Sequence, residues 1–411
     1  MSNRLTNFTI GIFLSASMAA ALAGQVKADA ITDWNLRSGE IIAEAKIGTP
    51  PAIRAMAVVQ TAAYQAANAV TRRYASGQSA IAAANGASID AAIAAAHRAA
   101  LVKFLPAQQL LIDTAYAAAL AGIAEGPAKA AGIAAGESAA AAVLASRADD
   151  TIAADTYRPH AVAGIYVPTA APAAFGWTQR KPWLMSAPLQ FRPAPPAALG
   201  SAIWARDYNE VQALGGAKST ARTAEQTEIA RFWEYSLPAI YFGVLRSAAV
   251  QPGREVTRNA RLFAAAAQAM DDAMISVFDA KYHYNFWRPV TAIRNGDLDG
   301  QATTDRDAAW TPMIDTPMHP EYPSAHSILA SAVGTVLQAD IGDAPMPTLT
   351  TSSPTAKGAS RSWSNVDDMV REVSNARIYE GVHFRNSTEV GVEMGRRIGN
   401  LAAERHLGPA R

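Results

Sequence analysis

The chain is predicted to be all-α, a large bundle of helices. Alanine, the strongest helix former, dominates residues 51–148, and larger apolar residues recur there three and four positions apart. The same helical spacing returns from Ala202 onward. No stretch of any length alternates apolar and polar residues, which is the pattern of a half-buried strand.

The first residues are predicted to be an export signal. Arg4 is followed by an apolar, uncharged run from Phe8 to Ala23, and small residues then offer cleavage after Ala23 or after Ala30. A retained membrane anchor is the alternative, but the run is short for a bilayer span. Residues 1–30 are therefore assigned to a signal peptide. The mature protein is expected to be secreted or periplasmic, with no membrane segment.

Residues 31–411 are predicted to form one domain in three parts. Residues 31–148 make an alanine-rich helical half, with helix breaks near Ser76-Gly77, Gly86, Pro106 and Gly126-Pro127. Residues 149–199 carry so many prolines that long helices are excluded. This part is expected to wrap the surface, with Trp177 and Trp183 as anchors. A disordered linker between two domains is the alternative.

Residues 200–411 form the second helical half. The predicted helices there lie near 203–214, 222–235, 256–284, 324–338, 364–380 and 386–406. A Pro/Ser/Thr-rich loop is expected over residues 344–360.

Composition excludes several classes of function. There is no cysteine, so disulfides, thiolate metal sites and cysteine nucleophiles are excluded. The formal net charge is +1, which argues against nucleic acid as the main partner.

Three motifs in the second half carry the candidate chemistry. In KYHYNFWRP, Lys281 and Arg288 lie seven residues apart, about two helical turns, so that one helix face could present both. Pro289 disfavours helix at the preceding residue, which places Arg288 at a helix end. Taken alone, this pair favours a solvated basic face over a binding site.

The second motif is YPSAHS. Ser324 is predicted to cap a helix, whose free N–H groups and positive dipole end, including the backbone N–H of Ala325, would attract an anion. His326 would lie in the first turn, within reach of that anion. An ordinary capped helix with an incidental histidine is the alternative.

The third motif is ARIYEGVHF. Arg377 and His383 are six residues apart, which does not suit one helix face. Gly381 can end the helix and turn His383 back toward the arginine. Alone, His383 could be a simple helix-end cap.

Together the motifs supply guanidinium forks, an ammonium, a hydroxyl and two histidines, a set that suits a tetrahedral oxyanion. One imidazole could bond the central atom while the other transfers protons. The bundle is thus expected to hold an oxyanion (vanadate or phosphate) site between its helices.

These motifs resemble those of the type 2 phosphatidic-acid phosphatase superfamily, in the branch of vanadium-dependent haloperoxidases and bacterial non-specific acid phosphatases. The family pattern is Lys-x6-Arg-Pro, then Pro-Ser-Gly-His, then Ser-Arg-x5-His-x3-Asp, and the match here runs from about Asp271 to Ser387. Asp33-Trp34-Asn35 and the helix MAVVQTAAYQAANAV also resemble secreted bacterial members of the haloperoxidase type.

The resemblance implies a role for each matching residue. Lys281, Arg288 and Arg377 would neutralise the oxyanion, and Ser324 and the Ala325 N–H would donate hydrogen bonds to it. His326 would be the acid–base group. His383 would bond vanadium in a haloperoxidase, or become phosphorylated in a phosphatase.

The implied cofactor is vanadate, without haem or flavin. The implied partners are hydrogen peroxide, a halide and a small organic acceptor, with hypohalous acid as the product. A homo-oligomer is left open.

Three positions depart from the family pattern. Ala325 replaces a glycine and Ala376 a serine. Ser387 replaces an aspartate, so a carboxylate that could orient His383 is missing, and Glu380 or Glu389 could not be placed as its substitute.

Halide preference is expected from two further positions. Fungal chloroperoxidases of the family carry aromatic residues where this chain has Phe278 and His319, and algal bromoperoxidases carry arginine and histidine. His319 favours bromide or iodide over chloride.

Other functions remain open at this point. An acid phosphatase would use the same pocket, and an exported oxyanion-binding scaffold would bind without turnover. A zinc hydrolase built from His319, Glu321, His326 and His383 is a further option, although the nearby cations would repel a dication.

Overall fold

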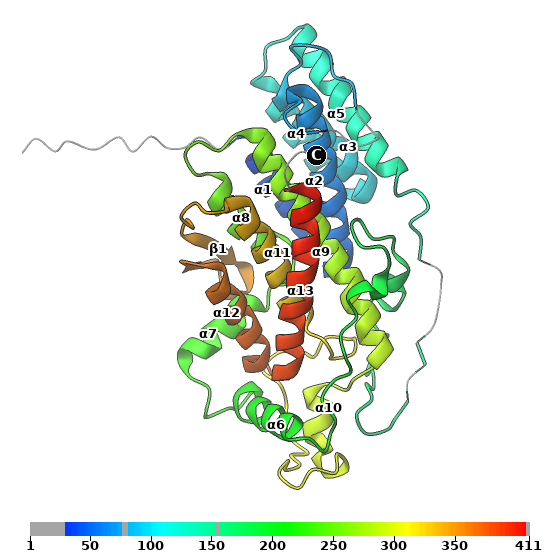
Figure 1. The fold of residues 1–411 in the computed structure, drawn as a ribbon, viewed down its shortest axis with the longest axis vertical. Coiled ribbons are helices and arrows are strands. Elements are labelled where there is room, and N and C mark those ends of the chain that lie inside the picture. The colour runs from blue at the N-terminus through cyan, green and yellow to red at the C-terminus, as the bar shows by residue number, and fades with distance from the viewer. Residues whose placement is uncertain (1–28, 76–80, 153–156, 159, 408–411) are drawn as a thin grey trace, which may run out of the picture.

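The computed structural model describes residues 29–75, 81–152, 157–158 and 160–407. Helices make up almost all of the regular structure in these ranges, which confirms the predicted all-α class (Figure 1). Apart from Asp29 and Ala30, the predicted signal peptide lies outside the described residues, as does the predicted break at Ser76-Gly77.

The α-helices follow one another along the chain, and the longest connections are the proline-rich region and those between α10 and α11 and between α11 and α12. In order they are α1 (Ala30–Glu44), α2 (Thr49–Thr71), α3 (Ile89–Phe104), α4 (Gln109–Ala121), α5 (Pro127–Ala145), α6 (Ala202–Gly215), α7 (Ala224–Trp233), α8 (Ala239–Ala249), α9 (Val256–Tyr284), α10 (Pro289–Arg294), α11 (Ala325–Ile341), α12 (Val366–Tyr379) and α13 (Arg385–His406). Short 3₁₀ helices are η1 (Pro106–Gln108), η2 (Phe175–Gln179), η3 (Pro188–Phe191), η4 (Gly296–Leu298) and η5 (Pro354–Ala356), and the strands are β1 (Leu349–Ser353) and β2 (Ala359–Trp363).

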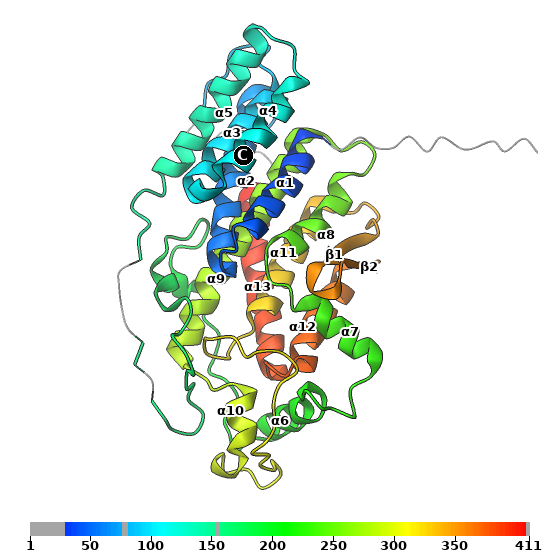
Figure 2. The same ribbon diagram turned by 180° about the vertical axis from the view of Figure 1, so that it is seen from behind.

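The bundle is elongated, with α3, α4 and α5 at one end of its long axis and α6 and α10 at the other (Figures 1 and 2). α9 and α13 run beside each other through the middle, and α11 packs against both. None of the helices in the described ranges is both long enough and apolar enough for a bilayer crossing.

Most predicted helices are found within two residues of their expected bounds. α9 covers the predicted range 256–284, and Ser324 caps α11 by accepting a hydrogen bond from the Ser327 backbone N–H. α8 and α10 were not predicted; α10 has only six residues, too few to show a helical period.

The loop prediction for residues 344–360 is wrong in part. β1 and β2 pair antiparallel there, with Leu349 opposite Trp363. β1 does alternate buried and exposed positions, but it reads LTTSS, so threonine and serine stand where an apolar alternation would have revealed a strand.

Two adjacent carboxylates of α9 hold the proline-rich segment. Asp272 accepts hydrogen bonds from the backbone N–H groups of Trp183, Leu184 and Met185 at 2.6, 2.8 and 2.9 Å. Asp271 accepts from the Trp183 indole N–H at 2.6 Å and from Arg54 of α2. Because buried polar groups need partners, these bonds seat the segment against α9.

Close packing of α13 on α11 depends on a row of glycines. A Cβ added at Gly395 would lie 2.3 Å from the Ile328 carbonyl oxygen, and Gly391 and Gly399 face α11 in the same way. The contact also reaches the N-terminus of α11, where the Ser324 N–H donates to the Ser387 carbonyl at 3.1 Å.

Gly395→Ala is expected to lower the free energy of unfolding by about 1–3 kcal/mol, the usual cost of overpacking a core. Denaturant unfolding would measure it. Gly122→Ala is the matched control, because a Cβ there meets nothing within 4 Å. Equal stabilities for the two variants would contradict the close-packing argument.

Candidate oxyanion site

Five segments bring the predicted cations and one histidine together. Lys281 comes from the last turn of α9, Arg288 caps α10, and Ser324 caps α11. Arg377 comes from the last turn of α12, and His383 from the loop before α13. All five are at most 2% exposed, so a ligand bound among them would be shielded from water.

The one-face interpretation of Lys281 and Arg288 is wrong, because α9 ends between them. Asn285 caps α9 in the left-handed conformation, with φ of 50°, and the chain turns there. Both side chains still reach the backbone carbonyls of residues 319–321. Lys281 Nζ donates to the carbonyls of Pro320 and Glu321 at 2.9 and 2.7 Å, and Arg288 Nε donates to the His319 carbonyl at 2.9 Å.

Arg288 links the first motif to the third and to His319, three residues before the second. Its Nη1 donates to the Val382 carbonyl at 2.7 Å and lies 3.3 Å from His383 Nε2, and its Nη2 lies 3.0 Å from His319 Nδ1. Since a guanidinium only donates hydrogen bonds, His383 Nε2 is an acceptor. His319 Nδ1 is also an acceptor in this contact, which is shorter than the 3.2 Å from Nδ1 to the Pro320 carbonyl. His383 Nε2 therefore carries a lone pair on the side of the cations.

Glu321 is a functional residue that the sequence interpretation missed. Its Oε1 lies 2.7 Å from His383 Nδ1 and accepts from the Phe384 N–H at 2.9 Å. Neither Glu380 nor Glu389 contacts His383: Glu380 pairs with Arg377, and Glu389 lies 3.7 Å from Arg206. The available signal in the sequence was the position of this carboxylate three residues before Ser324. Glu321 is considered there only as a zinc ligand.

Both histidines of the predicted pair are held neutral. Burial, reinforced by Arg288, Lys281 and Arg377, lowers the pKa of His383 well below its usual value. Burial and the same three cations also lower the pKa of His326. A neutral imidazole has a lone pair to give, so His383 can bond an electrophilic atom and His326 can accept a proton.

Lys281 is less readily protonated than a lysine in water. Burial lowers its pKa well below 10.5, and Arg288 lowers it further. An anion bound nearby would raise that pKa again, because opposite charge favours the protonated amine.

The N-terminus of α11 contributes donors. Ser324 Oγ accepts from Ser327 Oγ at 3.1 Å, which leaves the Ser324 hydroxyl hydrogen to point elsewhere. Ala325 and His326 lie in the first turn, where helix N–H groups have no intrahelical partner. Both are half-buried, as is His319.

Buried groups without partners indicate what the site would hold. Arg377 Nε and Nη1 make no aligned hydrogen bond within the described residues, although Nη1 is ion-paired with Glu380, and His326 Nε2 has no hydrogen-bond partner there. Leaving buried polar atoms without such bonds costs free energy. A tetrahedral oxyanion would satisfy them, so these residues fit vanadate or phosphate.

Glu380 adds a negative charge to this set. It is fully buried and forms an ion pair with Arg377, although its oxygens make no aligned hydrogen bond. Burial raises its pKa to about 8, an effect that Arg377 partly opposes. The Arg377 charge is therefore shared between Glu380 and any ligand.

The two expected halide residues lie in contact. The rings of Phe278 and His319 meet edge to face with centroids 5.3 Å apart. Because Arg288 Nη2 donates to His319 Nδ1, His319 connects the Phe278 wall with the cation cluster.

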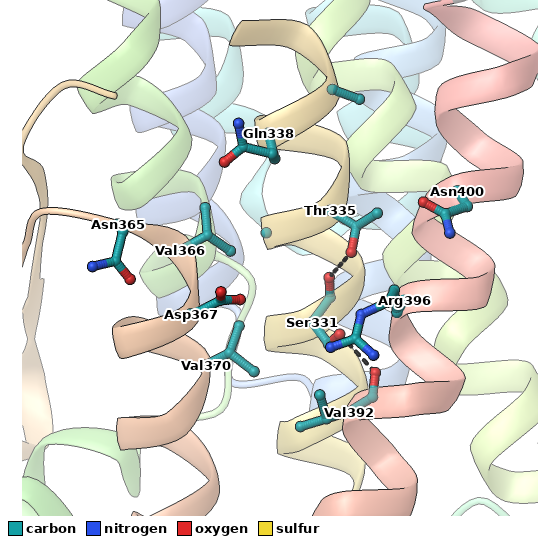
Figure 3. A pocket seen from close by; sticks show the side chains of 12 residues that line it. Ser331, Thr335, Gln338, Asn365, Val366, Asp367, Val370, Val392, Arg396 and Asn400 are labelled. Atoms are coloured by element: carbon teal, nitrogen blue, oxygen red, sulfur yellow. Dashed lines mark hydrogen bonds between the residues drawn. The ribbon is translucent and has the colours of Figure 1, made fainter. Parts of the chain in front are cut away.

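Two other sites can be set aside. No group of three or more histidine, aspartate or glutamate side chains in the described ranges could hold a metal ion, which overturns the zinc-hydrolase option. A pocket of about 540 Å³ lies between α11, α12 and α13, lined by residues such as Ser331, Thr335 and Arg396 (Figure 3). None of the predicted site residues lines it.

Comparison with known proteins agrees with the fold and the motifs. Residues 261–409 match the family model of the second helical-bundle domain of VCPO. The chain is 30% identical over 173 residues to the vanadium chloroperoxidase of Curvularia inaequalis, a match that covers 34% of this chain and 28% of that protein. The alignment thus spans less than a third of the fungal enzyme.

Solved structures extend the likeness over most of the chain. The first bacterial vanadium-dependent iodoperoxidase matches with a TM-score of 0.77 and 25% identity, covering 91% of this chain and 95% of that one. A holo-type bacterial vanadium-dependent chloroperoxidase shares the fold, with a TM-score of 0.71, 18% identity and coverage of 88% and 94%. The resemblance to vanadium-dependent haloperoxidases expected from the motifs is confirmed, by the family model over residues 261–409 and by the fold over most of the chain.

Proposed function

We propose that the protein is a vanadate-dependent haloperoxidase, which uses hydrogen peroxide to oxidise a halide to hypohalous acid. The observation that carries this is His383: a neutral imidazole whose Nε2 lone pair faces Arg288, in a site where the buried Arg377 Nε has no hydrogen-bond partner. Bound vanadate would activate peroxide toward attack by the halide without changing its own oxidation state. A small organic acceptor then takes up the halogen.

Each residue has a defined task in this proposal. His383 Nε2 would bond the vanadium, and Lys281, Arg288 and Arg377 would balance the charge of its oxygens. The Ser324 hydroxyl and the Ala325 N–H would donate to those oxygens. His326, neutral and with an unpartnered Nε2, would take a proton from incoming peroxide.

An acid phosphatase is the alternative function for the same residues, with His383 Nε2 as the nucleophile. The likeness to the bacterial iodoperoxidase favours the haloperoxidase, because it covers 91% of the chain and so includes the N-terminal helices. We further propose that bromide or iodide is preferred over chloride. The His319–Arg288 bond supports this, since it occupies a guanidinium N–H that could otherwise polarise the reacting oxygen.

We also propose export to the periplasm or beyond, with cleavage after Ala23. The Asp29 side chain caps α1 by accepting from the Thr32 N–H at 2.8 Å, and it accepts from Asn259 Nδ2 at 2.8 Å. Cleavage after Ala30 would remove this cap and leave the amide of Asn259 with one partner fewer.

The mature chain loaded with orthovanadate is expected to brominate an indicator dye when peroxide is added. Excess phosphate should suppress the reaction, because it competes for the same donors. A protein that leaves the dye unchanged but hydrolyses phosphate esters would be a phosphatase instead. Inertness toward both substrates would indicate an oxyanion-binding protein.

His383→Ala is expected to reduce vanadate-dependent bromination to background, because the bond to vanadium is lost. His326→Ala should lower kcat by about 10²–10⁴-fold, the usual contribution of an acid–base group, and leave vanadate binding within about threefold. Steady-state kinetics and equilibrium dialysis give the two quantities. Full activity of His383→Ala would refute the assignment.

His319→Phe is expected to raise the chloride-to-bromide ratio of kcat/KM by about tenfold. The change frees Arg288 Nη2 to donate to the reacting oxygen, which stabilises charge in the transition state, and chloride is the halide that most needs it. Phe278→Leu is the comparison, since it alters the same wall without freeing the guanidinium. An unchanged ratio would remove His319 from halide selection.

Glu380→Gln is expected to tighten phosphate binding about tenfold at pH 9 and to leave it nearly unchanged at pH 6. The pKa of Glu380 is raised to about 8, so the carboxyl is mostly neutral at pH 6 and competes for Arg377 only when ionised above pH 8. Calorimetric titration gives both constants. Taking the ratio to wild type cancels the titration of phosphate itself, and Glu389→Gln, at an exposed carboxylate, is the control. A ratio that does not vary with pH would contradict the competition.

A further inference from the structure

The carboxylate of Glu321 has one oxygen committed to two donors. The side chain is fully buried, and its Oε1 accepts from the Phe384 N–H while lying 2.7 Å from His383 Nδ1. Since Phe384 follows His383 directly, the two bonds hold the imidazole and its own backbone from the same point. The orientation of the ring is thereby fixed.

The main chain of Glu321 is equally constrained. Its N–H donates to the Phe286 carbonyl at 2.9 Å, and its carbonyl accepts from Lys281 Nζ at 2.7 Å. One residue thus contacts the lysine through its backbone and the histidine through its side chain. Displacing Glu321 would disturb both.

The partners of His383 define its tautomer from both sides. At Nδ1 the partner is Glu321 Oε1, an oxygen that also accepts from the Phe384 N–H and so acts as an acceptor, and Nδ1 therefore carries the hydrogen. At Nε2 the partner is Arg288, which only donates. Both contacts require the same form, with the Nε2 lone pair toward the cations.

We propose that Glu321 is the positioning residue of this site, and that it holds His383 in the Nδ1–H tautomer with Nε2 presented to the oxyanion. It does so in place of the carboxylate that the family pattern has four residues after the histidine. That the oxyanion is vanadate rests on the proposed function; the tautomer does not.

Ser387 cannot replace Glu321 in this role. Its hydroxyl is 3.3 Å from His383 Nδ1, against 2.7 Å for the carboxylate, and a hydroxyl can donate as well as accept. With Glu321 removed, Ser387 could donate to an unprotonated Nδ1 and so stabilise the wrong tautomer. Hydrogen bonds to an ionised acceptor are also about twice as strong as neutral ones.

The first test measures the tautomer in protein free of vanadate. With ¹⁵N-histidine labelling, two-bond correlations distinguish Nδ1–H from Nε2–H, and His383→Gln identifies the His383 signals among the seven histidines. Wild type and Ser387→Ala are expected to show Nδ1–H. Glu321→Ala should lose that form, and Glu321→Gln, whose amide oxygen still accepts, should keep it.

The second test is vanadate affinity by equilibrium dialysis. Glu321→Ala should weaken binding by about 10–100-fold, as loss of a partner behind a metal-bound histidine usually does. Glu321→Gln should weaken it less, which separates positioning from a folding defect. Ser387→Ala should change it by less than about threefold.

The outcomes of the two tests distinguish the role of Glu321 from the proposed function. If Glu321→Ala folded and kept His383 in the Nδ1–H form, the proposal would be overturned. The same holds if Ser387→Ala, and not Glu321→Ala, lost that form. If wild type had the expected tautomer but bound no vanadate, the proposed function would fail while the role of Glu321 stood.

Discussion

The fork of Arg288 is the interaction on which the site depends. A guanidinium that is 1% exposed must have its N–H groups satisfied within the protein. Its bonds reach the His319 carbonyl, the Val382 carbonyl and two imidazole nitrogens, and so join segments about 30 and 95 residues distant in sequence. Those bonds hold the third motif beside the His319 segment, and the contact with His383 orients its Nε2 toward Arg288. Lysine could not take this place, because it lacks the planar set of donors.

Helices and helix ends were predictable because their signals are local. The bounds of α9, the cap at Ser324 and the chain reversal at Gly381, where φ is +77°, all follow from neighbouring residues. A side chain at Gly381 would also meet the Gly215 carbonyl, at 2.3 Å for a Cβ. The β1–β2 hairpin was not predicted, because threonine and serine occupy alternating positions of β1 where apolar residues would have indicated a strand. Whether residues 31–411 form one domain stays a prediction.

The site was predictable as a set of residues but not as a network of contacts. Spacing placed Lys281 and Arg288 near each other for the wrong reason, since a turn at Asn285, and not a shared helix face, brings them together. The carboxylate partners of His383 and Arg377 were harder to predict from the sequence. Glu380 and Glu389 are near His383 in sequence and could not be placed, whereas folding brings Glu321 to His383 from 62 residues away and pairs Glu380 with Arg377. Roles that arise from such long-range contacts leave no local pattern in one sequence.

The paired carboxylates of α9 have a consequence for how the chain can vary in length. Asp272 holds the proline-rich segment, and Lys281 lies nine residues further along the same helix. An α-helix turns about 100° per residue, so one residue inserted between them would swing the lysine away from the Pro320 and Glu321 carbonyls. The proline-rich segment, with its irregular backbone, can absorb insertions by looping outward. Related chains should therefore keep the Asp-to-Lys interval constant and place their insertions and deletions on the surface beyond it.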